Sequence, residues 1–189
     1  SDVCSSDLPL ISKAVEMIAR SFRGGGRLFY FGAGTSGRLG VLDASECPPT
    51  FNTDPAMVQG IIAGGREALW QAQEGAEDDF EAGERAARFR GVNRGDVVVG
   101  IAASGRTPFV WGAIHQAKRA AAKTILLAFN PNLRFAPEIR PDIVIIPETG
   151  PELLTGSTRL KAGSCTKMIL NMFTTLAMAN VGKVMGNLM

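Results

Sequence analysis

The glycine-rich turn at residues 32–37 (GAGTSG) constrains the fold more than any other stretch of this chain. It follows the apolar run 28–31 and precedes a helical pattern that opens at Arg38. A strand, a glycine-rich turn and a helix start in this order bring unpaired backbone N–H groups and the positive end of a helix dipole to one point. Thr35 and Ser36 add two hydroxyl donors. We therefore interpret the turn as a site for a phosphorylated small molecule.

The sequence of this turn allows three other interpretations. Its sequence fits the dinucleotide-binding pattern G-x-G-x-x-G. That pattern also needs an acidic residue about 20 positions later, at the end of the second strand. The second predicted strand, residues 58–62, ends instead in residues 63–65 (AGG), and Asp54 precedes it. A P-loop would continue into Gly-Lys-Ser/Thr, which does not follow the turn. A tight turn without any ligand remains the alternative to a phosphate site.

Predicted strands alternate with predicted helices, and this pattern indicates a parallel sheet covered on both faces. At 189 residues, without a linker or a repeat, one α/β domain is the natural count. We expect Pro48 and Pro49 to end the helix after the turn, because a residue before proline is pushed away from helical angles. The expected strands are residues 28–31, 58–62, 96–101, 124–129 and 143–146, and the expected helices begin at about residues 9, 38, 66, 77, 108 and 159.

Charge and composition restrict the partners. The 20 basic and 18 acidic residues leave a net charge of +2, too small to suggest a nucleic-acid surface. No apolar stretch has the length of a membrane span. Cys4, Cys47 and Cys165 have no metal-binding spacing, which favours a reducing cytoplasm, and we expect Cys47 to be a buried thiol. With His115 as the one histidine, neither a His-based triad nor a histidine-rich metal site is expected.

Two more hydroxyl-rich loops accompany the first. Residues 104–107 (SGRT) follow the third strand, and ligands of open α/β sheets gather at the carboxyl ends of strands where the strand order reverses. Residues 155–158 (TGST) precede the last helix, where an N-cap by Ser157 or Thr158 is the simpler role. The predicted phosphate-binding residues are Gly34, Thr35, Ser36, Gly37, Ser104, Gly105, Arg106, Thr107 and Ser157.

Five ordered blocks of the sequence resemble the N-acetylmuramic acid 6-phosphate etherase family: residues 32–40, 42–50, 74–78, 100–108 and 154–163. The resemblance runs from about residue 24 to residue 189. It implies the SIS (sugar isomerase) fold, a three-layer αβα sandwich with a five-stranded parallel sheet. It also implies a cytoplasmic lyase of peptidoglycan recycling and amino sugar catabolism, without a metal or redox cofactor. Such an enzyme cleaves the D-lactyl ether of N-acetylmuramic acid 6-phosphate into N-acetylglucosamine 6-phosphate and D-lactate.

By the pattern of this family, Glu46 and Glu77 match the two acid/base residues. An ether oxygen at C3 leaves poorly unless it is protonated, and the C2 proton becomes acidic only when the open ring exposes the C1 aldehyde. One carboxylate must remove that proton while a carboxylic acid protonates the departing oxygen, and water then adds in the reverse sense. We expect Glu77 to be the base and Glu46 the acid. From the residues alone, Glu46 is expected to be a solvated side chain on a helix surface. Glu77 is expected to be one of three acidic residues that complement the dipole at a helix start.

The chain departs from the family pattern at both ends and in one loop. Residues 1–8 match nothing in the family, and its C-terminal helical region is missing, so we expect a SIS domain at residues 9–189 of a truncated chain. Residues 130–133 (NPNL) lack the Gly-Ser pair usual after that Asn-Pro. The resemblance further implies a homodimer with sites completed across the interface.

Two alternative functions stay open. A non-catalytic sugar-phosphate-binding regulatory domain, as in the glucokinase regulatory protein and some bacterial transcription regulators, needs the phosphate loops but not both glutamates. A sugar phosphate isomerase would use similar loops and one base to move protons between C1 and C2.

Overall fold

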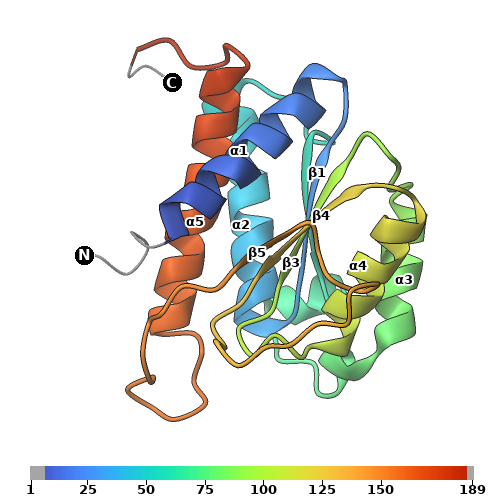
Figure 1. Cartoon of the computed structure of the whole chain (residues 1–189), viewed down its shortest axis with the longest axis vertical. Coiled ribbons are helices and arrows are strands. Elements are labelled where there is room, and N and C mark those ends of the chain that lie inside the picture. The colour runs from blue at the N-terminus through green and yellow to red at the C-terminus, as the bar shows by residue number, and fades with distance from the viewer. Residues whose placement is uncertain (1–6, 187–189) are drawn as a thin grey trace.

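A five-stranded parallel sheet between two layers of helices forms the centre of the computed structural model, which describes residues 7–186 (Figure 1). The strands are ordered β2-β1-β3-β4-β5, and each neighbouring pair is parallel. This confirms the predicted three-layer α/β fold. The strands are β1 Leu28–Gly32, β2 Val58–Ile62, β3 Val97–Ile101, β4 Lys123–Leu127 and β5 Ile143–Ile145.

Five α-helices cover the two faces of the sheet (Figure 1). On one face lie α1 Leu8–Arg23, α2 Gly34–Phe51 and α5 Lys161–Asn180. On the other lie α3 Phe80–Phe89 and α4 Pro108–Arg119. Two 3₁₀ turns, η2 Arg66–Leu69 and η3 Ala76–Asp78, lie between β2 and α3. The helix expected to begin at about residue 66 is only the short turn η2, and the one expected at about residue 77 begins at Phe80 as α3. Residues 1–8 were expected to match nothing in the family. Six of them, residues 1–6, lie outside the described residues, and α1 begins at the eighth, Leu8.

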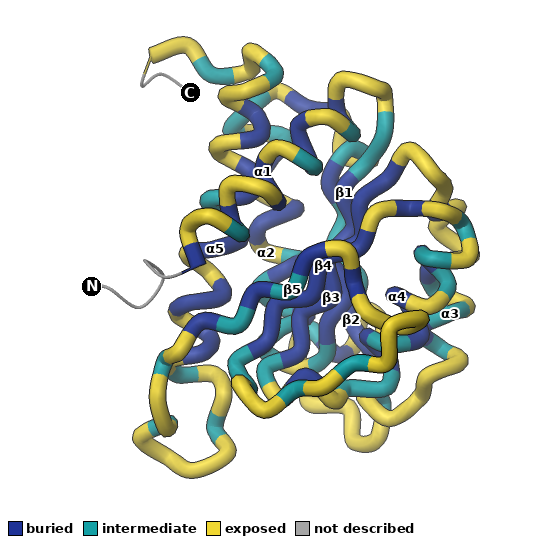
Figure 2. Tube along the Cα trace, viewed as in Figure 1, coloured by how far each residue is buried: buried dark blue, intermediate teal, exposed yellow. Residues whose placement is uncertain are grey.

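The core consists of two apolar layers, one on each side of the sheet (Figure 2). Successive side chains of a strand point to opposite faces, so Leu28 and Tyr30 pack among α1, α2 and α5. Phe29 and Phe31 pack toward α3 and α4. Every residue of β1 and of β3 is buried, as expected for central parallel strands that are covered twice.

The prediction that Pro48 and Pro49 end the helix after the glycine-rich turn is wrong, because α2 continues through both prolines to Phe51. The prolines remove two backbone donors, but the last turns are kept in place by packing: Cys47 is buried and Phe51 packs against the core. The helix ends instead at Asn52, which adopts left-handed angles (φ 50°, ψ 51°) typical of a helix C-terminus. Tertiary packing therefore overrides the local preference before proline.

The predicted N-cap of the last helix by Ser157 or Thr158 is also wrong. The helix α5 begins at Lys161, and the Glu152 carboxylate accepts hydrogen bonds from the backbone N–H groups of Lys161 and Ala162, each at 2.9 Å. These bonds, first that from Ala162, hold the pKa of Glu152 below its usual range. The Glu152 carboxylate thus caps the start of α5 in place of the predicted hydroxyl of Ser157 or Thr158, because the loop before α5 folds back over the helix start.

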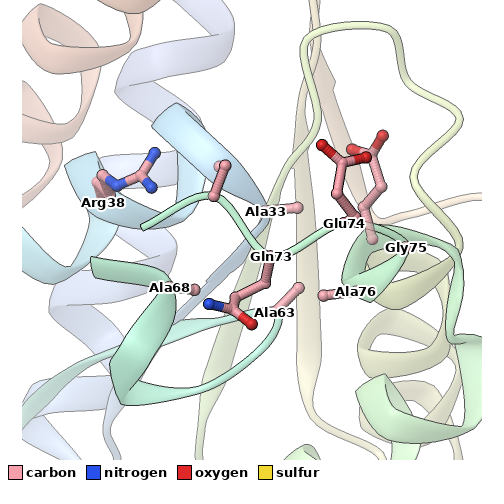
Figure 3. Close-up of a pocket in the computed structure, with 11 residues that line it drawn as sticks. Ala33, Arg38, Ala63, Ala68, Gln73, Glu74, Gly75 and Ala76 are labelled. Carbon is pink, nitrogen blue, oxygen red and sulfur yellow. The ribbon is translucent and has the colours of Figure 1, made fainter. Parts of the chain in front are cut away.

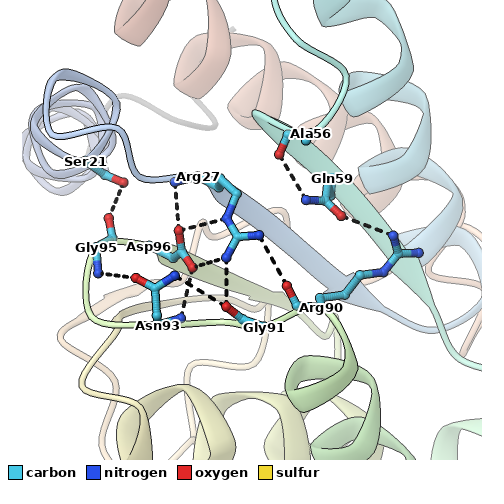
Figure 4. A network of polar contacts seen from close by, with 9 residues as sticks. All are labelled: Ser21, Arg27, Ala56, Gln59, Arg90, Gly91, Asn93, Gly95 and Asp96. Atoms are coloured by element: carbon cyan, nitrogen blue, oxygen red, sulfur yellow. Dashed lines mark hydrogen bonds and ion pairs between the residues drawn. The ribbon is translucent and has the colours of Figure 1, made fainter.

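A buried ion pair joins the amino-terminal ends of β1 and β3 (Figure 4). The Asp96 side chain is 1% exposed and accepts bonds from the Arg27 backbone N–H (2.9 Å), Nε (3.2 Å) and Nη2 (2.8 Å) and from the Asn93 N–H (2.9 Å). Arg27 also donates to the Gly91 carbonyl and lies over the Phe29 ring. Every oxygen of this carboxylate is therefore occupied, and its charge is compensated where it is buried.

We expect Asp96→Ala to lower the free energy of unfolding by about 3 kcal/mol, because the partly buried Arg27 would lose its counter-charge and the Asn93 N–H its acceptor. Urea unfolding followed by circular dichroism measures this change. The matched control is Glu81→Ala, which removes an exposed pair with Arg85 and should change stability by less than about 1 kcal/mol. Equal effects for the two variants would contradict a special role for the buried pair.

Candidate active site

Two of the predicted phosphate loops lie at the point where the strand order reverses. Beginning at β1, the sheet grows to β2 in one direction and to β3 in the other, so the crevice between β1 and β3 is its topological switch point. Gly32 at the end of β1 pairs in register with Ile101 at the end of β3. Residues 34–37 and 104–107 therefore leave the sheet side by side at its carboxyl edge. This is the usual ligand-binding position of such sheets.

Close packing explains the glycines of the first loop. A Cβ on Gly32 would lie 2.6 Å from the Gly37 nitrogen, and a Cβ on Gly37 would lie 2.6 Å from Ile62 Cγ1. Gly34 has a φ of +52°, which favours glycine. No side chain caps α2, whose N-cap residue is Ala33. The first-turn N–H groups, including those of Thr35 and Ser36, therefore point out of the helix start without a capping side chain.

The second loop is held by its own contacts. Ser104 Oγ accepts from the Arg106 N–H at 3.2 Å, and Trp111 Nε1 donates to the Gly105 carbonyl at 2.9 Å. Gly105 has a φ of +72°, and a side chain there would overlap Leu133. Thr107 is the N-cap residue of α4 without a side-chain cap bond, and the Arg106 side chain is exposed.

A pocket of about 210 Å³ opens between the start of α2 and residues 63–77 (Figure 3). It brings together two predicted site residues, Gly34 and Glu77. Glu77 belongs to the 3₁₀ turn η3, where it is exposed at the pocket wall. Arg38, Gln73 and Glu74 also line the pocket, although none of the three was predicted as a site residue. The sequence contains one indication for two of them, since Arg38 and Glu74 fall within blocks that resemble the etherase family. It contains none for Gln73.

The other predicted residues lie outside this pocket. Glu46 is exposed and lies about 18 Å further along α2 than Gly34, given 1.5 Å of rise per residue. Within the described chain, the structure does not bring Glu46 and Glu77 together. Thr35 lines a second hollow of about 430 Å³ with Arg159 and Lys167. Ser157 lies in the loop before α5. The first turn of α5 lies beside Thr35, because a Cβ on Gly163 would be 3.6 Å from Thr35 Cγ2.

The comparison with known families decides the classification. The family described as the glucokinase regulatory protein N-terminal SIS domain matches residues 10–118, more than half of the chain. The chain belongs to this SIS family. The fold predicted from the resemblance is thereby confirmed, together with the five-stranded parallel sheet.

Among similar proteins, this SIS domain is 55% identical to the N-acetylmuramic acid 6-phosphate etherase of Salinibacter ruber over 97% of the chain and 58% of that protein. It is 57% identical to the etherase of Rhodopirellula baltica over 95% of the chain and 59% of that protein. The chain thus spans about three-fifths of the length of these relatives. The resemblance noted in the sequence is confirmed by this similarity.

Solved structures share the fold at low sequence identity. The phosphoheptose isomerase of Neisseria gonorrhoeae superposes with a TM-score of 0.67 at 16% identity, covering 93% of this chain and 89% of that one. The NanR protein of Vibrio vulnificus, solved with ManNAc-6P, gives a TM-score of 0.56 at 15% identity, covering 88% and 53%. Both likenesses concern the fold of the SIS domain alone.

Behind the site, the SIS domain buries a polar cluster between α2, β1 and α5. The Asp43 carboxylate accepts from Tyr30 Oη (2.9 Å), Asn171 Nδ2 (2.8 Å) and Thr174 Oγ1 (3.2 Å). Burial raises the pKa of Asp43, although these three bonds oppose the shift. The cluster ties α5 to α2 and so holds the helix whose first turn forms part of the glycine-rich turn. No helix among residues 7–186 is long and apolar enough to cross a bilayer.

The expected burial of Cys47 is confirmed, since its side chain is 2% exposed and its Sγ donates to the Asp43 carbonyl at 3.2 Å. Burial, and next the nearby Asp43 charge, raise the pKa of Cys47 to about 12. We expect this thiol to resist iodoacetamide at pH 8 in the folded protein and to react after unfolding, because the thiolate is the nucleophile. Mass spectrometry of the Cys47 peptide measures this. Native-state alkylation as fast as that of a free thiol would contradict it.

Proposed function

We propose that this SIS domain is the catalytic domain of an N-acetylmuramic acid 6-phosphate etherase, a carbon–oxygen lyase of peptidoglycan recycling. The observation that carries the proposal is 55–57% identity to such etherases over at least 95% of the chain. The geometry agrees, because Glu77 and the start of the glycine-rich turn line one pocket beside the topological switch point. D-lactate and N-acetylglucosamine 6-phosphate are the proposed products.

In this proposal the substrate's phosphate binds the uncharged donors of residues 34–37 and 104–107, with Arg106 at the rim. Backbone N–H groups at the starts of α2 and α4 and the hydroxyls of Ser36 and Ser104 supply those donors. The open-chain sugar then presents its C2 proton to Glu77. Loss of that proton expels the C3 lactyl oxygen, which takes a proton from Glu46, and water adds to C3 of the unsaturated aldehyde to form the product.

A homodimer is part of the proposal. Glu46 is exposed on α2 and does not line the pocket of its own chain, and Leu42, one turn earlier, is 47% exposed. A second copy seated on this surface could bring its Glu46 to the first copy's pocket. We further propose a cytoplasmic location, which is supported by the buried free thiol of Cys47, since reducing compartments preserve thiols.

A direct assay tests the proposed function. The chain is incubated with N-acetylmuramic acid 6-phosphate, and D-lactate is measured with D-lactate dehydrogenase. We expect lactate and N-acetylglucosamine 6-phosphate in equal amounts. Binding of the sugar phosphate without lactate would favour the regulatory-domain alternative. Conversion of an aldose phosphate into a ketose phosphate without lactate would favour the isomerase alternative.

A further inference from the structure

Arg38 lines the same pocket as Glu77 and is a cation that the proposed proton transfers do not use. It lies one turn after Gly34 in α2 and is half-buried. Its Nε donates to the Leu69 carbonyl at 3.1 Å, which fixes the plane of the guanidinium. Within residues 7–186, Arg38 makes no ion pair, and its two Nη nitrogens have no hydrogen-bond partner. The side chain is thus positioned but retains donors for a ligand.

The charges of the pocket wall single out this arginine. Arg38 is the one cationic residue among the eleven that line the pocket, whereas Glu74 and Glu77 contribute two carboxylates. Five of the other lining residues are alanines, which offer no polar side-chain atoms. Figure 3 shows Arg38 and Glu74 on opposite sides of the pocket. An anionic group that enters beside the two glutamates therefore finds its compensating charge at Arg38.

The substrate class of the proposed function carries such a group. Besides its phosphate, the lactyl ether bears a carboxylate, attached two bonds from the C3 oxygen and therefore close to the C2 proton that Glu77 would take. The phosphate is served by the neutral donors of the two loops, so it does not require Arg38. A guanidinium presents parallel N–H groups that match a carboxylate in a bidentate manner.

We propose that Arg38 binds the carboxylate of the lactyl group and thereby makes the pocket specific for acidic ethers. This inference rests on the proposed function and identifies the residue that recognises the lactyl leaving group. Arg38 is a positioning residue: it holds the C3 substituent so that C2 faces Glu77. It also explains how a pocket with two glutamates accepts an anion.

Binding measurements test the inference without depending on turnover. The full chain carrying Glu77→Gln is titrated by calorimetry with N-acetylmuramic acid 6-phosphate and with its lactamide, which has the same shape but no carboxylate charge. We expect the acid to bind about 10- to 100-fold more tightly than the amide. Adding Arg38→Gln should make the two affinities equal, mostly by weakening the acid. Arg38→Lys should keep part of the preference, since the charge remains without the bidentate geometry.

The control is Arg66→Gln, an exposed arginine at the start of η2 that does not line the pocket and should leave the preference unchanged. If Arg38→Gln weakens acid and amide equally, Arg38 serves the phosphate or only supports Leu69, and the inference is overturned. The two proposals fail separately. Lactate release by the parent chain with no Arg38-dependent preference would refute this inference alone, whereas the preference without lactate release would refute the etherase assignment alone.

Discussion

In the proposed etherase, Glu77→Gln should reduce the rate of D-lactate release from N-acetylmuramic acid 6-phosphate by about 10³-fold. Glutamine keeps the size of the side chain at the pocket wall but cannot accept the C2 proton, and a positioned general base contributes about 10² to 10⁴ in rate. The loss should appear in kcat more than in KM, because the proposed phosphate-binding loops are unchanged. Lactate release under saturating substrate measures it. Exchange of the C2 proton of N-acetylglucosamine 6-phosphate with deuterium should fall in parallel.

Glu74→Gln provides the matched control for Glu77→Gln. Glu74 lines the same pocket, three residues earlier in the same segment, so the substitution makes an equal change of charge and shape. We expect less than about a tenfold effect on lactate release, since only one carboxylate removes the C2 proton. If Glu74→Gln were the more damaging change, the base would have to be reassigned to Glu74.

Most of the sheet could be predicted from the sequence, because a doubly covered parallel strand is a continuous apolar run whose ends are marked by glycine or charge. The run at residues 97–101 shows this, since every side chain in it is buried. The wrong predictions concern the end of α2 and the start of α5, which are determined by contacts between residues far apart in the sequence. Pro48 and Pro49 stay helical because α2 packs on the core, and α5 is capped by Glu152 from the preceding loop. Neither contact has a periodic signature in the sequence.

The site was predictable only in its outline. Carboxyl ends of parallel strands meet at one edge, so the loops after β1 and β3 were expected together there, and the strand order makes them neighbours. Arg38 and Glu74 were not selected because their pocket depends on how residues 63–77 fold back against α2. The separation of Glu46 from Glu77 likewise follows from the direction of α2, which runs away from the carboxyl edge of the sheet.

Glu46→Ala should lower lactate release by about 10³-fold or more while C2 proton exchange on N-acetylglucosamine 6-phosphate continues. The product has no lactyl group to protonate, so exchange needs only the base, whereas elimination of an ether oxygen also needs the acid. Nuclear magnetic resonance of the product in deuterium oxide measures exchange beside the lactate assay. Loss of both activities in Glu46→Ala would contradict this division of roles.

Mixed dimers test which copy of the proposed homodimer supplies Glu46. Because Glu46 lies about 18 Å along α2 from the pocket of its own chain, we expect it to serve the partner's pocket. Glu46→Ala and Glu77→Gln chains, each inactive alone, are unfolded together and refolded at equal amounts. Random pairing makes half of the dimers mixed, and each mixed dimer regains one intact site of two, so activity should return to about one quarter of the parent level. If each Glu46 served its own chain, both sites of a mixed dimer would lack one glutamate and the mixture would stay inactive. Refolding Glu46→Ala with Glu46→Gln is the control, since no pairing of those chains restores the acid.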